Sequence, residues 1–289
     1  MTLPPDNRLD GDTPLRQAQL VMLRLLKALD TLCKEEGLVY WLDAGTLLGA
    51  ARHGGFIPWD DDIDVMMPWD DYQRLYAVAA DKLPFDMFFQ TGESDPGFPC
   101  AWAKIRDRFS HLEEAGGPYP YSQAISIDIF PVVLATEREH RLRAFYALLP
   151  PWRRAIEWPA RQFSFMSNGK RLATGLVQWA FRALFSLPPL GRALRAWFAK
   201  GEKAWEYLPP IRWTNRFARD LVEPLGSIRF EDADFPAPAR VDEFLTAYFG
   251  DWRTPPPEEQ RVSEHAVTAI HPTGPNPHSS GLAWEDYYG

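Results

Sequence analysis

Four aspartates lie within five positions of this chain, and together they could bind a cation. Asp60, Asp61, Asp62 and Asp64 follow the loop sequence HGGFIPW and have apolar residues on both sides. Carboxylates this close repel one another, and burying them without a positive partner is costly. The pattern indicates either a solvated acidic turn or a cation site, and the apolar surroundings favour the cation site.

Alternation along a strand gives two of these carboxylates a common face. Asp62 and Asp64 point to one side of an extended segment, while Ile63 and Val65 point to the other. A rise of roughly 3.3 Å per residue separates the two aspartate Cα atoms by about 7 Å, which lets their carboxylates converge on shared metal ions. Hard oxygen ligands suit Mg²⁺, Mn²⁺ or Ca²⁺ rather than zinc.

A calcium-binding helical loop also begins with three alternating acidic residues, as Asp60, Asp62 and Asp64 do. That loop needs glycine at its sixth position and glutamate at its twelfth, where this chain has Val65 and Asp71. Metal-assisted phosphoryl transfer fits better, because that reaction needs cations to neutralise the non-bridging phosphate oxygens. Asp60 and Asp61 are then expected to fix the loop or to bind metal through water.

Two other segments carry groups suited to the same chemistry. Asp128 stands in the otherwise apolar run AISIDIFPVV, where it could be an ion-pair partner, a third metal ligand or a general base. Gly45 and Thr46 lead from a strand into a short helix, and free backbone N–H groups beside a hydroxyl can bind an anion there. The sequence therefore predicts a catalytic metal site at Asp62, Asp64 and Asp128, with Gly45 and Thr46 near phosphate.

Basic residues near these segments are candidates for holding phosphate. Lys104, Arg106 and Arg108 alternate along an expected strand, so all three could share one face. The alternative is an exposed basic strand face. Arg52 lies between the Gly-Thr turn and the acidic run, and it is expected to bind phosphate or Asp60 unless it is a solvated loop residue.

These residues need a scaffold of helices and strands to bring them together. Helix signals begin with Thr13 and Pro14 and end at Gly37, and a second long helix is expected from about Asp70 to Leu83. A short helix is expected in TLLGAAR, and strands in LVYWLDA, IDVMM, DMFFQ, CAWAKIRDRF and AISIDIFPVVL. This alternation predicts an α/β (α+β) fold, a mixed sheet flanked by helices.

The composition is that of an acidic globular protein. The 289 residues are 46% hydrophobic and 24% charged, and the formal net charge is -8. This acidity argues against nucleic-acid binding, and no apolar run is long enough to span a bilayer. Two cysteines without metal-site spacing, and a first segment without signal-peptide layout, lead us to expect a protein of the reducing cytoplasm.

The segment 138–205 differs from the rest of the chain in charge. Its lysines and arginines outnumber its acidic residues by ten. Its pattern is typical of amphipathic helices, which suit an anionic membrane surface or equally the packing of tryptophans onto a sheet. The tryptophans concerned are Trp152, Trp158, Trp179, Trp197 and Trp205. One more helix and an irregular C-terminal segment are expected after it.

The stretch YWLDAGTLLGAARHGGFIPWDDDIDV resembles the signature of the LicD family, relatives of fukutin and fukutin-related protein in the nucleotidyltransferase superfamily. The blocks KIRDR, IDIFP and YFGDWRTPPPEEQRVSEH extend the resemblance. It implies a nucleotidyltransferase-type sheet in which Asp62, Asp64 and Asp128 hold two divalent ions, Mg²⁺ or Mn²⁺, beside a nucleotide diphosphate. Lys104 and His265 fall within the family blocks and are expected to line the site.

The resemblance also implies a reaction and its partners. LicD-type enzymes move phosphocholine from CDP-choline to a glycan, and fukutin-type relatives move ribitol phosphate from CDP-ribitol. We therefore expect a phosphotransferase with a CDP-linked donor, a glycan or glycolipid acceptor and CMP as product, with peripheral contact to the inner face of the membrane through 138–205. A single catalytic domain over 1–289 is expected, with a helical insertion or subdomain at 138–213.

Other activities stay open at this point. A nucleotidyltransferase would use the same metal site to attack the α-phosphate of a nucleoside triphosphate, and a D-x-D sugar transferase would release UDP or GDP. A domain that only binds nucleotide is disfavoured, because all three acidic positions are intact. The transferred group is also open. Four tryptophans are candidates for a choline-binding aromatic box or for the core: Trp41, Trp59, Trp69 and Trp102.

Overall fold

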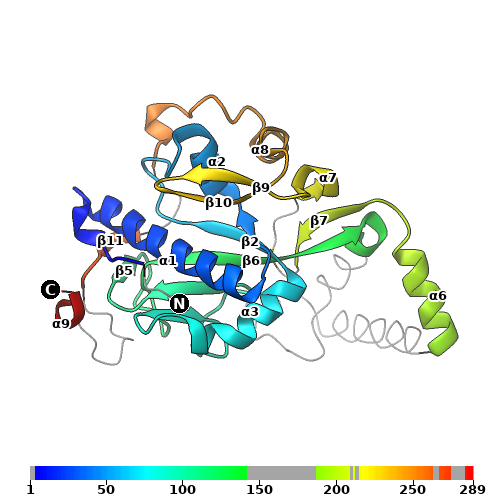
Figure 1. Ribbon diagram of the computed structural model, residues 1–289, viewed down its shortest axis with the longest axis horizontal. Helices are drawn as coiled ribbons and strands as arrows, with labels where there is room; N and C mark the ends of the chain where they lie inside the picture. Colours follow the sequence, from blue (N-terminus) through cyan, green and yellow to red (C-terminus); the bar gives the residue numbers. More distant parts are fainter. Residues whose placement is uncertain are drawn as a thin grey trace. The chain divides into compact units, whose positions relative to one another are not determined.

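A computed structural model describes residues 4–141, 187–208, 211, 215–262, 267–274 and 284–288 (Figure 1). The chain forms two compact units. The first consists of the segments Met1–Pro131 and Asp220–Gly289, and the second is Val132–Arg219. In the described parts of both units, no helix has the length and apolar character needed to cross a membrane.

The core of the first unit is a sheet in the order β1-β2-β6-β4-β3. Helices α1 and α3 pack on it, and α2 contacts β2 (Figure 1). The predicted α/β fold, a mixed sheet flanked by helices, is confirmed. The strands are β1 (Trp41–Leu42), β2 (Asp64–Pro68), β3 (Met87–Gln90), β4 (Ala103–Asp107) and β6 (Ser126–Thr136), whose first half belongs to this unit.

Helix α1 (Pro14–Glu36) agrees with its sequence signals at both ends. The Thr13 hydroxyl accepts a hydrogen bond from the Arg16 N–H at 3.1 Å, and Gly37 ends the helix in the left-handed region with φ 62°. The side of the helix that carries Leu25 and Leu29 is fully buried. This packing makes α1 a fixed support for the loop that carries the acidic cluster.

The connection between β1 and α2 is tighter than predicted. Of the expected strand LVYWLDA only two residues form β1, because α2 (Ala44–His53) begins directly after Asp43. The Asp43 N–H donates to the Asp64 carbonyl at 3.0 Å and turns the chain into the helix. Ala44 has φ 42°, a conformation that is uncommon for a residue with a Cβ. The next helix, α3 (Trp69–Lys82), lies within two residues of its expected bounds.

Two small antiparallel sheets of two strands each in the first unit were not predicted. β5 (His111–Glu114) pairs with β11 (Val267–His271), and β9 (Gly226–Phe230) pairs with β10 (Ala233–Ala237). The expected C-terminal helix is present as α8, and β11 lies in a segment predicted to be irregular. The remaining short elements are η1 (Arg8–Asp10), α7 (Arg219–Val222), α8 (Val241–Phe249), η3 (Glu258–Gln260) and α9 (Glu285–Tyr288).

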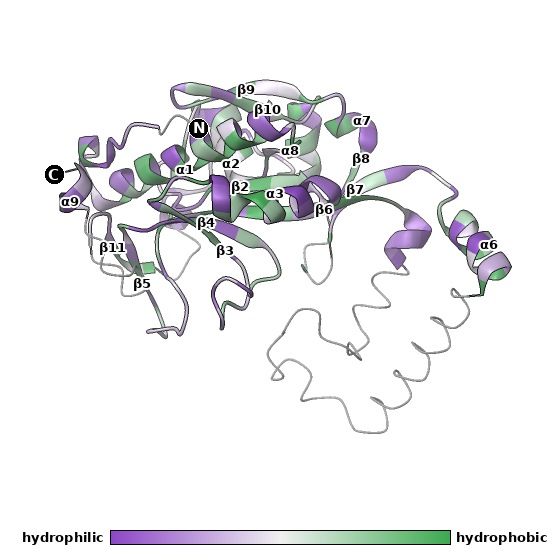
Figure 2. Cartoon of the chain, turned by 60° about the horizontal axis from the view of Figure 1, so that its bottom comes forward, coloured by the Kyte–Doolittle hydropathy of each residue, from purple (hydrophilic) through white to green (hydrophobic). Residues whose placement is uncertain are grey.

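The described part of the second unit combines strands with a helix, so the expected helical insertion or subdomain at 138–213 also contains a strand. The second half of β6 pairs with β7 (Lys203–Tyr207), which pairs with β8 (Arg216–Ala218). Trp205 lies in β7 with 9% of its surface exposed, not on an amphipathic helix. Helix α6 (Pro188–Phe198) shows the mixed polar and apolar colouring of an amphipathic helix (Figure 2). Trp152, Trp158 and Trp179 lie outside the described residues.

Candidate active site

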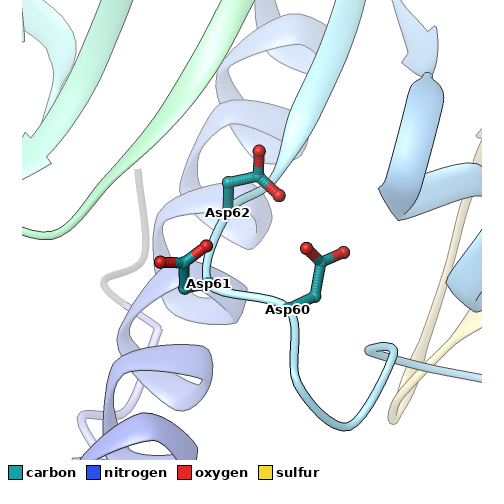
Figure 3. Close-up of side chains that lie close together, drawn as sticks. All are labelled: Asp60, Asp61 and Asp62. Carbon is teal, nitrogen blue, oxygen red and sulfur yellow. The ribbon is translucent and has the colours of Figure 1, made fainter. Parts of the chain in front are cut away.

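The loop before β2 brings three carboxylates together. Oxygens of Asp60, Asp61 and Asp62 all lie within 4.8 Å of one another, and the three side chains are partly exposed (Figure 3). The Gln19 side chain of α1 donates to the Asp60 carbonyl at 3.0 Å and fixes the loop. Gly45 lies against this loop: a Cβ on it would meet Asp60 Oδ2 at 2.9 Å. The Gly-Thr turn and the acidic loop are therefore in direct contact.

Asp64 begins β2 and is surrounded by other acidic groups. Burial raises the pKa of its carboxyl well above the usual value, and the charges of Asp62, Asp128 and Asp43 raise it further in that order. The positive charge of Lys104 acts in the opposite direction. Asp62, Asp128 and Asp43 are therefore close enough to Asp64 for their charges to repel it. Their roles as ligands and catalytic groups stay predictions.

Asp128 lies on the strand next to the acidic loop. Its N–H donates to the carbonyl of Ile63 at 2.8 Å, so Asp128 is level with the residue between Asp62 and Asp64. Its carboxylate accepts a hydrogen bond from Trp102 Nε1 at 3.0 Å and forms an ion pair with Lys104 at 2.5 Å. From the sequence, Trp102 was a candidate only for a choline-binding box or for the core. A single tryptophan before a strand does not by itself indicate a hydrogen bond to a carboxylate.

Thr46 is bonded to the acidic strand. It is buried in the first turn of α2, and its hydroxyl oxygen accepts the Asp64 N–H at 2.8 Å. The Asp64 carbonyl accepts the Asp43 N–H at 3.0 Å, so both backbone groups of Asp64 are fixed by the start of α2. Asp43 was not among the predicted site residues, although it directly precedes Ala44 and Gly45 in the sequence. The predicted contact of Gly45 and Thr46 with phosphate stays a prediction.

Replacing Thr46 by valine should destabilise the protein. The Asp64 N–H would lose its acceptor, and an unsatisfied buried donor costs about 1–3 kcal/mol. Thr46→Ser keeps the hydroxyl and should lose much less. The measurement is the free energy of unfolding from chemical denaturation. A loss in Thr46→Val no larger than that in Thr46→Ser would show that the hydrogen bond to the Asp64 N–H contributes little to stability.

The three alternating basic residues do not act alike. Lys104 reaches Asp128, whereas Arg106 is 3% exposed and donates to the Gln90 side chain and the Ala124 carbonyl. Burial lowers the pKa of Arg106. Arg108 follows the end of β4 and donates to the Met87 carbonyl at 3.1 Å. The expected phosphate contact of Arg106 is thus not supported, because these donors already bind protein oxygens in the interior.

Arg52 lies at the other end of α2. Its guanidinium donates to the Trp252 carbonyl at 3.0 Å, which ties α2 to the segment after α8. Burial lowers the pKa of Arg52, and the nearby charge of Arg261 lowers it further. Arg261 itself lies 5.6 Å from the centre of the Trp59 ring. His265, which was expected to line the site, lies outside the described residues.

The tryptophans proposed for a choline-binding box do not form one shared group of contacts. Trp41 is in the core, and Trp69 stacks on Tyr72 with 5.6 Å between ring centroids. Trp102 packs against Phe130 at 5.0 Å. Trp59, directly before the acidic loop, faces an arginine, as described above. These separate contacts favour individual packing roles.

The residues present fit a hard divalent cation. The acidic loop, Asp64 and Asp128 offer carboxylate oxygens, which Mg²⁺ and Mn²⁺ prefer. Burial raises the pKa of Asp64, and the charges of the neighbouring carboxylates raise it further, so these groups repel one another. A divalent cation would relieve this repulsion.

Residues 37–166 match the family described as LicD/FKTN/FKRP, nucleotidyltransferase domain. The predicted resemblance to the LicD family is confirmed, as is the prediction that the chain is an enzyme of the LicD transferase type.

Several known proteins are similar to this chain. The lipopolysaccharide cholinephosphotransferase LicD of Haemophilus influenzae is 29% identical over 276 residues, which cover 88% of this chain and 97% of that protein. An uncharacterized protein of Rickettsia prowazekii is 42% identical over 59 residues, which cover 20% of this chain and 22% of that protein. The ribitol 5-phosphate transferase FKRP of Homo sapiens is 57% identical over 35 residues, 12% of this chain and 7% of that protein.

Proposed function

We propose that the protein transfers a substituted phosphate, of the phosphocholine or alditol-phosphate kind, from a CDP-activated donor to a glycan hydroxyl and releases CMP. Support comes from the names of two relatives, a lipopolysaccharide cholinephosphotransferase and a ribitol 5-phosphate transferase. The observation that carries the proposal is the acidic neighbourhood of Asp64: the charges of Asp62 and Asp128 act on it, and its N–H donates to Thr46 of the Gly-Thr turn.

Asp62, Asp64 and Asp128 would hold the divalent cations, Mg²⁺ or Mn²⁺. When bound, such cations neutralise the charge of the donor diphosphate and lower the pKa of an oxygen nucleophile. The protein's own contribution is to fix the ligands. Thr46 and Asp43 hold both backbone groups of Asp64, and Gln19 holds the loop that ends in Asp62.

In the proposed reaction the acceptor hydroxyl oxygen attacks the phosphorus that carries the substituent. A bond forms between that oxygen and phosphorus, and the phosphorus–oxygen bond to CMP breaks. The hydroxyl proton must leave the acceptor, and Asp128 is positioned either to take it as a general base or to act as a ligand. Lys104, next to Asp128, supplies a positive charge beside the phosphate groups.

A product assay tests the proposal. Purified protein is incubated with Mg²⁺ or Mn²⁺, a lipopolysaccharide acceptor and, in separate reactions, CDP-choline, CDP-ribitol and CDP-glycerol. We expect CMP to appear with at least one donor and the acceptor to gain its phosphate group. Pyrophosphate from a nucleoside triphosphate would instead identify a nucleotidyltransferase, and UDP or GDP from a nucleotide sugar would identify a sugar transferase.

We also propose that α6 of the second unit contacts an anionic membrane surface. Leu187, Leu190 and Trp197 are exposed on or beside this helix, and Arg192 and Arg195 are exposed on it as well. Exposed leucine and tryptophan side chains beside arginines match the interface of an anionic bilayer. A lipid-linked glycan acceptor would bring the enzyme to such a surface.

Vesicle co-sedimentation tests this contact. The full chain should sediment with phosphatidylglycerol vesicles at low salt but not with phosphatidylcholine vesicles. Arg192→Ala combined with Arg195→Ala should lower the partition coefficient roughly tenfold or more, at about 1 kcal/mol per basic residue. Val262→Ala, which removes an exposed apolar side chain of the first unit, is the control. Absence of sedimentation with the anionic vesicles would reject the contact.

A further inference from the structure

Lys104 and Asp128 form an ion pair inside the candidate site. β4 and β6 run antiparallel with Lys104 directly opposite Asp128, and Lys104 Nζ lies 2.5 Å from Asp128 Oδ1. The two side chains are only 19% and 13% exposed. Because residues directly opposite each other on an antiparallel pair have neighbouring Cβ atoms, the strand register itself brings this cation to the carboxylate.

The second oxygen of the same carboxylate has a different kind of partner. Trp102 Nε1 donates to Asp128 Oδ2 at 3.0 Å. The indole is held by packing on Phe130, the second residue after Asp128 on the same strand, with 5.0 Å between ring centroids. Asp128 Oδ2 is thus bound by the neutral N–H of a packed indole ring. Asp128 Oδ1 is bound by the charged ammonium at the end of the flexible Lys104 side chain.

We propose that Lys104 is the resident counter-cation of this site and competes with the divalent cation for Asp128 Oδ1. In the metal-free protein the ammonium occupies that oxygen, and cation binding displaces it while Trp102 keeps Oδ2 in place. This inference rests on the proposed function, which assigns Asp128 to the metal. The displaced ammonium is then available to an anionic oxygen of the donor.

Calorimetric titration of the full chain with Mg²⁺ or Mn²⁺ alone tests the competition. Lys104→Met should bind the cation about tenfold more tightly than the wild type, because the cation no longer has to break a charged hydrogen bond. Lys104→Arg keeps the charge and should bind as the wild type does. Lys27→Met is the matched control: it makes the same charge change at an exposed pair with Asp232 and should leave the affinity unchanged.

Thermal unfolding provides a second measurement. Without metal, Lys104→Met should melt at a lower temperature than the wild type. Adding the cation should raise the melting temperature of Lys104→Met by more than it raises that of the wild type. Lys104→Gln should behave in the same way, and it replaces the methionine variant if that variant does not fold.

Unchanged or weaker cation binding in the uncharged Lys104 variants would overturn the inference, as would equal tightening in Lys27→Met. No donor or acceptor is present in these titrations. A failed transfer assay would therefore reject the proposed reaction without deciding the competition, and unchanged cation affinity would reject the competition while leaving the reaction intact.

Discussion

Asp62→Ala is expected to abolish transfer while leaving the fold intact. Asp62 lies at the end of the acidic loop and acts electrostatically on Asp64, so its loss removes a predicted ligand from the centre of the site. Metal ions contribute several kcal/mol to the stabilisation of a phosphoryl transition state, which corresponds to a loss of roughly 10³-fold or more in kcat. Removing one of several crowded negative charges should not lower the free energy of unfolding of the metal-free protein.

Asp128→Asn should be equally inactive, for a related reason. The amide keeps the shape of the side chain but cannot carry the negative charge that binds a cation or accepts a proton. Asp81→Ala, at an exposed position near the end of α3, is the control and should retain wild-type kcat and KM. The measurement is the steady-state rate of CMP release together with the unfolding curve of each variant. A turnover close to that of the wild type in either site variant would remove that aspartate from the metal site.

The part of the fold that could be predicted is the part decided by local signals. α1 has a capping threonine, a proline at its first position and a left-handed glycine at its end, and each acts within a few residues. The strands of the central sheet are marked by apolar runs. The common face predicted for Asp62 and Asp64 is not decided by such local signals, because β2 begins at Asp64 and Asp62 lies in the loop before it.

The register between strands could not be predicted in this way. That Lys104 stands opposite Asp128, and that the Asp128 N–H meets the Ile63 carbonyl, depends on how separate segments pair. The sequence placed these residues on strands but had no means to choose among registers. This is why Lys104 was predicted to meet phosphate and is found on a carboxylate.

Tertiary packing also overrides patterns that suggest exposure. Arg106 alternates with Lys104, yet its guanidinium is surrounded by Gln90 and the Ala124 carbonyl because two strands and a loop enclose it. Trp205 stands among basic residues in the sequence but is buried in β7. In the β9–β10 hairpin, Glu231 has φ 57° at a turn where a glycine would have been the usual signal.

A second large effect is expected far from the acidic loop, at the buried ion pair of Arg8 and Asp107. The guanidinium donates to both carboxylate oxygens, at 3.0 and 2.7 Å, and both side chains are completely buried. Burial opposes the charge of Arg8, but Asp107 and Asp6 outweigh it and raise the pKa of the guanidinium. Arg8 also donates to the Pro272 carbonyl, so it joins the N-terminal segment, the end of β4 and the C-terminal region.

Arg8→Met should lower the free energy of unfolding by about 3–5 kcal/mol, because it leaves the Asp107 carboxylate buried without its cation. Adding Asp107→Leu should recover only part of this loss, since Asp6, whose side chain is buried and pairs with Arg8 at 2.7 Å, stays without its cation. Lys27→Met breaks the exposed pair with Asp232 and should cost less than about 1 kcal/mol. Chemical denaturation measures all three variants. If Arg8→Met lowered the free energy of unfolding no more than Lys27→Met does, another group would have to compensate the charge of Asp107. The end of β4 would then not depend on Arg8 for its stability.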